Sequence, residues 1–133
     1  MCCDIEVVAG PTTGGIILAF EVARQLGVRS IYAEKGESGE RIFRRSLMIK
    51  PGERVLVVDD ILTTGGSVEQ VISAVKKLGG NVAGVGILVD RSENKLEFDV
   101  PFFACLSSKT QTYKPGSCPL CEANIPLVKP GGG

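Results

Sequence analysis

Three short apolar runs, each followed by glycine-rich or polar residues, constrain the fold of this chain more than any other feature. They lie at residues 5–9, 55–58 and 82–89, and residues 30–33 form a shorter fourth candidate. The runs are rich in β-branched side chains and lack polar alternation, which is typical of strands buried on both faces of a parallel sheet. Each run is therefore predicted to be a strand.

Two helices are predicted between these strands. Residues 15–26 end at Gly27, a typical C-terminal cap, and residues 67–78 begin at Ser67 and carry lysines in their last turn. The first helix has apolar side chains at helical spacing, namely Ile16, Phe20, Ala23 and Leu26. The alternation of strands and helices predicts an α/β fold, an open parallel sheet flanked by helices with right-handed crossovers.

The length of 133 residues fits one domain. We expect a core at residues 1–106, with a flexible loop and hairpin at 36–50. Residues 107–133 hold four of the seven prolines and end in three glycines, so they are expected to form an irregular tail.

Composition excludes several classes of function. Fifteen basic and fifteen acidic residues give no net charge, so nucleic-acid binding is not expected. No apolar run approaches the ~18 residues of a membrane helix, no secretory signal is visible, and five unevenly spaced cysteines favour a reduced, cytoplasmic protein. Because histidine is absent, a Ser-His-Asp triad, a Cys-His pair and a histidine-ligated metal are excluded.

The strongest motif follows the predicted strand at 55–58. Two adjacent carboxylates, Asp59 and Asp60, precede a turn of threonines and glycines that leads into the second helix. Glycines let backbone amides approach an anion, hydroxyls add donors, and the helix N-terminus adds a positive dipole end, so the turn can bind a phosphate. The two carboxylates could then accept hydrogen bonds from sugar hydroxyls or bind a cation such as magnesium.

Two other interpretations of this motif are less favoured. It is neither a Walker loop nor a dinucleotide-binding turn, because neither glycine pattern is present. A turn without any ligand is the plainer alternative, but two adjacent acids at a strand end are costly without partners.

Residues 57–67 resemble the phosphoribosyl pyrophosphate binding motif of type I phosphoribosyltransferases, in which apolar residues precede two acids and a Thr/Gly/Ser turn. The resemblance implies a parallel sheet flanked by helices, with the two acids at the ribose hydroxyls and the turn around the 5-phosphate. The implied phosphoribosyl pyrophosphate ligands are Lys35, Asp59, Asp60, Ile61, Leu62, Thr63, Thr64, Gly65, Gly66 and Ser67.

Three further segments resemble this family. Residues 9–15 resemble its pyrophosphate loop, which implies roles for Thr12, Thr13 and Gly14. Residues 85–91 resemble the strand end at which an arginine meets the orotate carboxylate in orotate phosphoribosyltransferases, which implies orotate binding by Arg91 and Thr63. A guanidinium suits a planar carboxylate, although a surface arginine is the plainer alternative.

Residues 32–36 resemble the start of a flexible catalytic loop that, in this family, enters the active site of the dimer partner. The resemblance implies that Lys35 contacts pyrophosphate in the neighbouring subunit. Arg41, Arg44 and Arg45 are weaker candidates, and solvation at the surface is the plainer interpretation for at least one of them.

Taken together, these resemblances imply transfer of a phosphoribosyl group to orotate, giving orotidine 5'-monophosphate and pyrophosphate in pyrimidine biosynthesis. Lys35, Asp59 and Asp60 would be catalytic. Mg²⁺ would be the cofactor, with no direct protein ligand predicted for it. The working unit would be a homodimer with shared sites. Alternatives are a purine phosphoribosyltransferase and a non-catalytic regulator that binds phosphoribosyl pyrophosphate.

The chain also departs from the family pattern. An N-terminal section that contributes to the hood over the base is not seen, Gly14 stands where some relatives have lysine, and the flexible loop has no histidine. Separately, Cys118 and Cys121 have the spacing of a metal knuckle or redox pair. Since they offer only two ligands, either a zinc ion shared across a dimer or a turn with free thiols is possible; the other cysteines (Cys2, Cys3 and Cys105) lie in no motif.

Overall fold

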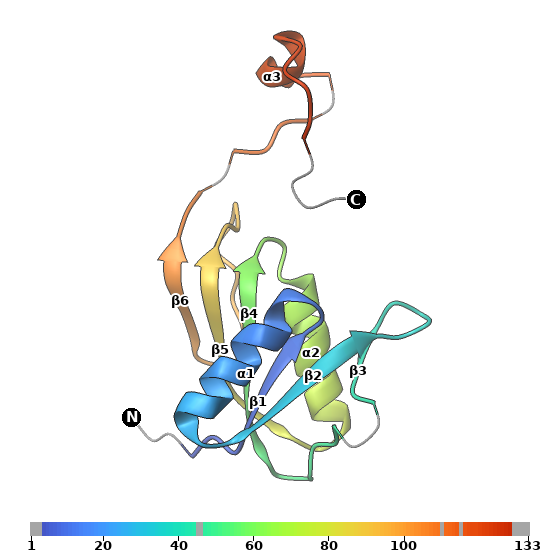
Figure 1. Cartoon of the computed structure of the whole chain (residues 1–133), viewed down its shortest axis with the longest axis vertical. Coiled ribbons are helices and arrows are strands. Elements are labelled where there is room, and N and C mark those ends of the chain that lie inside the picture. The colour runs from blue at the N-terminus through green and yellow to red at the C-terminus, as the bar shows by residue number, and fades with distance from the viewer. Residues whose placement is uncertain (1–3, 45–46, 110, 115, 129–133) are drawn as a thin grey trace.

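The described residues form a six-stranded sheet with helices on both faces (Figure 1). The structure is a computed structural model that describes residues 4–44, 47–109, 111–114 and 116–128. The strands are β1 (Val7–Pro11), β2 (Arg29–Lys35), β3 (Arg41–Ile42), β4 (Arg54–Leu62), β5 (Asn81–Asp90) and β6 (Phe102–Ser107). The helices are α1 (Gly14–Leu26), α2 (Gly66–Lys77) and α3 (Pro119–Glu122).

The predicted parallel sheet is confirmed, with one antiparallel strand added. The order is β3-β2-β1-β4-β5-β6, and only β3 runs antiparallel to its neighbour, with Lys35 opposite Arg41. The strand β6 was not predicted. It lacks the β-branched run that marks the central strands, and it lies at the sheet edge with Phe102 half-buried and Phe103 exposed.

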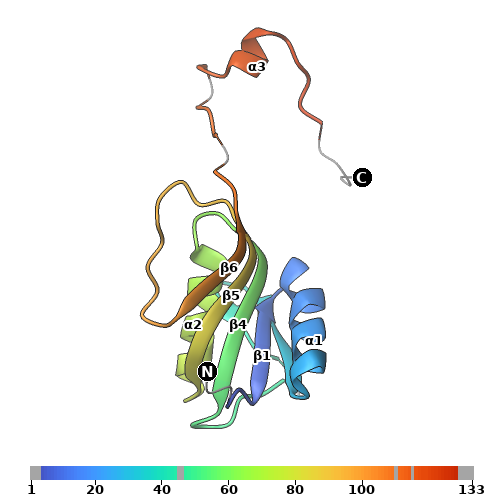
Figure 2. The ribbon, with the colours of Figure 1, turned by 90° about the vertical axis from the view of Figure 1, so that its left-hand side faces the viewer.

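The two long helices cover opposite faces of the sheet (Figure 2). The larger core cluster lies under α2 and includes Val57, Val71 and Ile87, whereas a smaller one lies under α1 and includes Val8 and Ala23. The crossover from β1 to β2 uses α1, and the crossover from β4 to β5 uses α2. The chain order therefore reverses between β1 and β4, and in such sheets ligands bind at the carboxyl ends of those strands.

The inward face of α1 differs from the expected one. Of the four apolar side chains at helical spacing only Ala23 is buried, while Phe20 is 60% exposed. The buried positions of α1 are Gly15, Ala19 and Ala23. Small residues are buried on this face because the helix lies close to β1. A β-carbon on Gly10 of β1 would overlap the Gly15 carbonyl.

The helix ends follow the prediction closely. Gly27 caps α1 in the left-handed conformation with φ of 69°, and α2 carries Lys76 and Lys77 in its last turn. The start of α2 lies one residue earlier than predicted, at Gly66, because Gly65 takes the capping position with φ of 83°. Among the described residues, no helix is both long and apolar enough to cross a bilayer.

The tail after β6 extends away from the sheet and carries α3 at a distance from the body (Figures 1 and 2). The expectation of an irregular tail misses this short helix. Its turn is held by local hydrogen bonds, in which the amide of Glu122 donates to the Cys118 carbonyl at 3.0 Å and that of Ala123 to the Pro119 carbonyl at 3.1 Å.

Candidate active site

Two loops meet at the carboxyl ends of β1 and β4. Residues 12–13 connect β1 to α1, and residues 63–65 connect β4 to α2. Because β1 and β4 are parallel neighbours, with Ala9 opposite Val57, both loops lie at the same sheet edge. The contact is direct: a β-carbon on Gly14 would overlap the Asp60 carboxylate, and one on Gly15 would lie 3.3 Å from Oδ1 of Asp59.

The acid pair lies in β4, close to the end of the strand. Asp59 is 7% exposed, and its Oδ1 accepts a hydrogen bond from the Asp60 amide at 2.9 Å. The amide of Ile61 donates to Oδ1 of Asp60 at 2.8 Å. Burial, followed by a side-chain hydrogen bond with Asp60 and its charge, raises the pKa of Asp59 to about 7, while the hydrogen bond from the Asp60 amide and the charge of Arg41 oppose this shift. The pair can thus bind sugar hydroxyls as acceptor and as proton-sharing partner.

The turn at residues 63–67 has the form of an anion-binding site. Gly65 has φ of 83°, and α2 begins without a side-chain cap, so the first amides of the helix face a small hollow of about 50 Å³. A β-carbon on Gly65 would lie 3.0 Å from Cδ1 of Leu96. Leu62, in contrast, is only 1% exposed, so its side chain belongs to the core and only its backbone borders the hollow.

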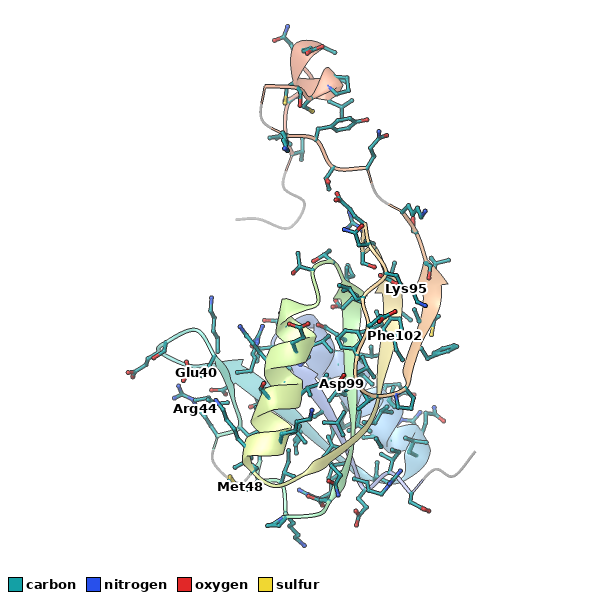
Figure 3. All side chains as sticks on the ribbon, turned by 180° about the vertical axis from the view of Figure 1, so that it is seen from behind. Glu40, Arg44, Met48, Lys95, Asp99 and Phe102 are labelled. Carbon is teal, nitrogen blue, oxygen red and sulfur yellow. The ribbon has the colours of Figure 1, made fainter. Side chains whose placement is uncertain are left out.

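A cleft of about 670 Å³ separates the β2–β3 hairpin from α2 and opens beside this turn. Lys35 and Arg41 line it from the hairpin, and Ser67 and Lys77 from the helix. Figure 3 shows Glu40 just before β3 and Arg44 just after it, both on the side of α2. Basic residues outnumber acidic ones in the cleft, which suits an anionic group next to the turn at residues 63–67.

Arg41 connects the hairpin to the first loop. Its Nη1 donates to Oγ1 of Thr12 at 2.6 Å and to the Ala33 carbonyl at 3.5 Å, and the Thr12 amide donates to the same carbonyl at 3.0 Å. The peptide bond from Thr12 to Thr13 is cis. Arg41 was a weak candidate in the sequence, yet it contacts the loop directly, whereas Arg44 pairs with Glu34 at 3.3 Å. Arg45 lies outside the described residues.

Arg91 borders a second cavity, of about 450 Å³, beside the turn at residues 63–67. It directly follows β5, and its amide donates to the Leu62 carbonyl at 2.8 Å, which holds it at the end of β4. Thr63 and Thr64 line the same cavity. The sequence prediction that Arg91 and Thr63 share one site is therefore consistent with their positions.

Four further residues of this cavity were missed from the sequence: Glu93, Asn94, Leu96 and Thr112. The first three follow Arg91 closely, so their position in the chain could have indicated them. Thr112 belongs to the tail and carries no such signal. It reaches the cavity because its hydroxyl donates a hydrogen bond to Oε1 of Glu93.

The oxygen donors at this edge determine whether it can bind a magnesium ion. Within the described ranges, no cluster of three or more His, Cys, Asp or Glu side chains forms a metal cage. Mg²⁺ commonly binds through substrate phosphates and waters with few carboxylates. The Asp60 carboxylate, which lies against the start of α1, offers oxygen donors of this kind.

Comparisons with known proteins agree with this geometry. Residues 4–120 match the phosphoribosyl transferase domain. The chain is 55% identical over 127 residues to an orotate phosphoribosyltransferase of Caldanaerobacter subterraneus subsp. tengcongensis, covering 96% of this chain and 66% of that protein. It is 56% identical over 128 residues to one from a Thermoanaerobacter species, covering 96% of this chain and 67% of that protein. The chain thus spans about two thirds of the length of these relatives.

Solved structures show the same fold. The orotate phosphoribosyltransferase of Aeropyrum pernix superposes with a TM-score of 0.65 at 29% identity, covering 79% of this chain and 63% of that one. The adenine phosphoribosyltransferase of Thermoanaerobacter pseudethanolicus superposes with a TM-score of 0.68 at 22% identity, covering 78% and 70%. The second likeness concerns the fold alone.

Proposed function

Because the chain belongs to the phosphoribosyl transferase domain family, we propose that it transfers the phosphoribosyl group of 5-phosphoribosyl 1-pyrophosphate to orotate. The products are orotidine 5'-monophosphate and pyrophosphate, a step of pyrimidine biosynthesis. The observation that carries this proposal is the contact between the first loop and the acid pair beside an uncapped helix start. The relatives named orotate phosphoribosyltransferase support orotate as the base.

The donor is assigned to the switch point between β1 and β4. The amides and hydroxyls of residues 63–67 bind the 5-phosphate, and Asp59 and Asp60 bind the ribose hydroxyls. Thr12, Thr13 and Gly14 face the pyrophosphate, together with Lys35. Mg²⁺ neutralises charge on that pyrophosphate when bound.

The reaction exchanges one bond at the anomeric carbon for another. The bond to the pyrophosphate oxygen breaks, a bond to the orotate nitrogen forms, and positive charge develops on the ribose between these events. The Asp60 carboxylate stabilises that charge, and Asp59 adds to the effect in the fraction of molecules in which it is ionised. The protein acts through positioning and electrostatics rather than through a covalent intermediate.

Arg91 determines the choice of base in this proposal. Its guanidinium binds the orotate carboxylate, and Thr63 lies between base and phosphate sites. A purine has no carboxylate for Arg91 to bind, which is why a purine base is the weaker alternative. A non-catalytic regulator would bind the donor without releasing pyrophosphate.

The proposal also includes the oligomeric state of the protein and its location in the cell. We infer a homodimer with shared active sites, because Lys35 is exposed and can contact a second copy of the chain. A cytoplasmic protein without nucleic-acid or membrane partners fits the balanced charge.

The test is pyrophosphate release that depends on orotate and Mg²⁺. The chain is assayed beside a version extended to the length of its relatives, with adenine and hypoxanthine as control bases. Orotate-dependent release from either protein, without release for the purines, is the expected result. Release with a purine alone, or donor binding without release in the extended protein, would contradict the proposal.

A further inference from the structure

The cavity beside Arg91 has one hydrocarbon wall. Of the described residues that line it, only Leu96 is aliphatic, and every other one carries a charge, a hydroxyl or an amide. A pyrimidine base has two kinds of surface, a polar edge of nitrogens and oxygens and two flat faces that form few hydrogen bonds. Binding sites orient such an edge with polar groups and cover the rest with apolar side chains. Leu96 is therefore the side chain of this cavity that suits the face of a base.

The segment that carries Leu96 is anchored in the protein core. Residues 91–101 connect β5 to β6 on the α2 side of the sheet (Figure 2), and Leu96 and Phe98 both pack against the core cluster under α2. The ring centroids of Phe98 and Phe102 lie 5.4 Å apart, so the segment is also attached to the edge strand. A side chain held in this way forms a wall before any ligand arrives, and a preformed wall loses little conformational entropy when a ring binds to it.

Leu96 also lies against the turn at residues 63–67. A β-carbon on Gly65 would lie 3.0 Å from Cδ1 and 4.0 Å from Cδ2 of Leu96. Gly65 caps α2 with φ of 83°, and the first amides of that helix face the hollow assigned to the 5-phosphate. One side chain thus borders the base cavity and packs against the turn proposed to bind phosphate.

We propose that Leu96 is a specificity-determining residue of phosphoribosyl transfer to orotate, an inference that rests on the proposed function. One face of the orotate ring packs on Leu96 while Arg91 binds the carboxylate. Because Leu96 also packs against Gly65, a phosphate bound in the turn fixes the position of the wall, and the base then binds more tightly. The effect is mutual, since the coupling free energy between two binding sites is reciprocal.

Calorimetric titration of the full chain with orotate and with ribose 5-phosphate tests this inference without turnover. Ribose 5-phosphate carries the 5-phosphate but no pyrophosphate, so it can occupy the turn without reacting with orotate. Each ligand is titrated alone and in the presence of the other. Leu96→Ala removes most of the wall, and Leu96→Met restores its volume. Leu78→Ala is the matched control, because Leu78 is another partly buried leucine packed against the same cluster, at the far end of α2.

The expected result is a loss of orotate affinity in Leu96→Ala of roughly 10–100-fold, the order expected for apolar contacts of this size in a binding pocket. Ribose 5-phosphate alone binds Leu96→Ala with wild-type affinity, but it no longer enhances orotate binding. Leu96→Met recovers both the affinity and the enhancement. Leu78→Ala keeps both, although thermal melting shows that it is destabilised to a similar degree as Leu96→Ala.

Three results would overturn the inference while leaving the proposed function in place. They are wild-type orotate affinity in Leu96→Ala, an equal loss of affinity in Leu78→Ala, and orotate binding by the wild type that ribose 5-phosphate does not enhance. A Leu96→Met variant that binds orotate as weakly as Leu96→Ala counts against the inference in the same way. A wild-type chain that binds no orotate, even with ribose 5-phosphate present, contradicts the proposed function itself and the inference with it.

Discussion

Gly14 and Asp60 approach so closely that a β-carbon on Gly14 would overlap the Asp60 carboxylate. One residue begins α1 after the first loop, and the other lies near the end of β4. The loop and the acid pair therefore form one unit, in which a side chain on the loop would displace a carboxylate.

The first prediction follows from this contact. Gly14→Ala should move the Asp60 carboxylate and lower kcat/KM for phosphoribosyl pyrophosphate by on the order of 100-fold, because a displacement near 1 Å misaligns the ribose. Gly86→Ala is the matched control, since its β-carbon would meet Val58 at an ordinary 3.6 Å. Equal activities of the two variants would show that Asp60 does not need its present position.

The second prediction concerns the pH dependence of folding. The pKa of Asp59 is raised to about 7, mainly by burial, whereas in the unfolded chain it takes the ordinary aspartate value of about 4. Between these values the folded state binds more protons than the unfolded state, so this group makes the free energy of unfolding fall as pH rises from about 4 to 7. Above pH 7 its effect no longer changes.

Urea unfolding at several pH values tests this effect. Asp59→Asn should remove the downward contribution, so the variant gains stability relative to the wild type as pH increases towards 7. The pKa of Glu53 is lowered, with Arg29 and the Lys50 amide favouring the ionised form against burial, and gives a trend of opposite sign. That trend is common to both proteins and cancels in the difference. A difference that stays constant across this window would refute the raised pKa.

The third prediction concerns Arg41. Arg41→Ala removes the hydrogen bond to Thr12 at 2.6 Å and should raise KM for phosphoribosyl pyrophosphate roughly tenfold, in line with a charge-assisted bond of about 1.5–3 kcal/mol. Arg44→Ala is the control, because its half-exposed pair with Glu34 should contribute about 0–1 kcal/mol. If both variants behave alike, Arg41 does not position the first loop.

The central features of this fold and site could be predicted from the sequence because they are local. A β-branched run followed at once by Asp59 and Asp60 fixes both the strand and the position of the acids. The same holds for Gly27, whose left-handed cap ends α1. Roles for these residues in catalysis are still predictions.

The features that were missed depend on contacts between distant segments. The inward face of α1 is set by the close approach of Gly10 to Gly15, so small residues are buried and Phe20 is not. The contact of Thr112 with Glu93 joins the tail to the loop after β5, and no local pattern encodes it. The edge strand β6 forms only because β5 offers it a parallel partner.

The fourth prediction concerns the base pocket. Arg91→Ala should weaken orotate binding by roughly 2–4 kcal/mol and leave the affinity for phosphoribosyl pyrophosphate nearly unchanged, because only orotate loses a charge-assisted pair. Lys95→Ala removes a nearby exposed charge and is the matched control (Figure 3). Calorimetric titration of both ligands decides the matter, and equal losses for both would make Arg91 a structural residue.

The last prediction concerns how Lys35 is used. In the single chain Lys35 lines a cleft with Ser67 of its own chain, whereas the proposed dimer offers it to the partner's site. Inactive Lys35→Ala and inactive Asp59→Ala/Asp60→Ala proteins are mixed, in a form whose wild type is active, and subunit exchange is verified. If sites are shared, each mixed dimer has one site with an intact lysine and intact acids. Random exchange makes about half of the dimers mixed, so recovery should approach about a quarter of wild-type activity. If Lys35 serves its own chain, both sites of a mixed dimer stay defective and no activity returns.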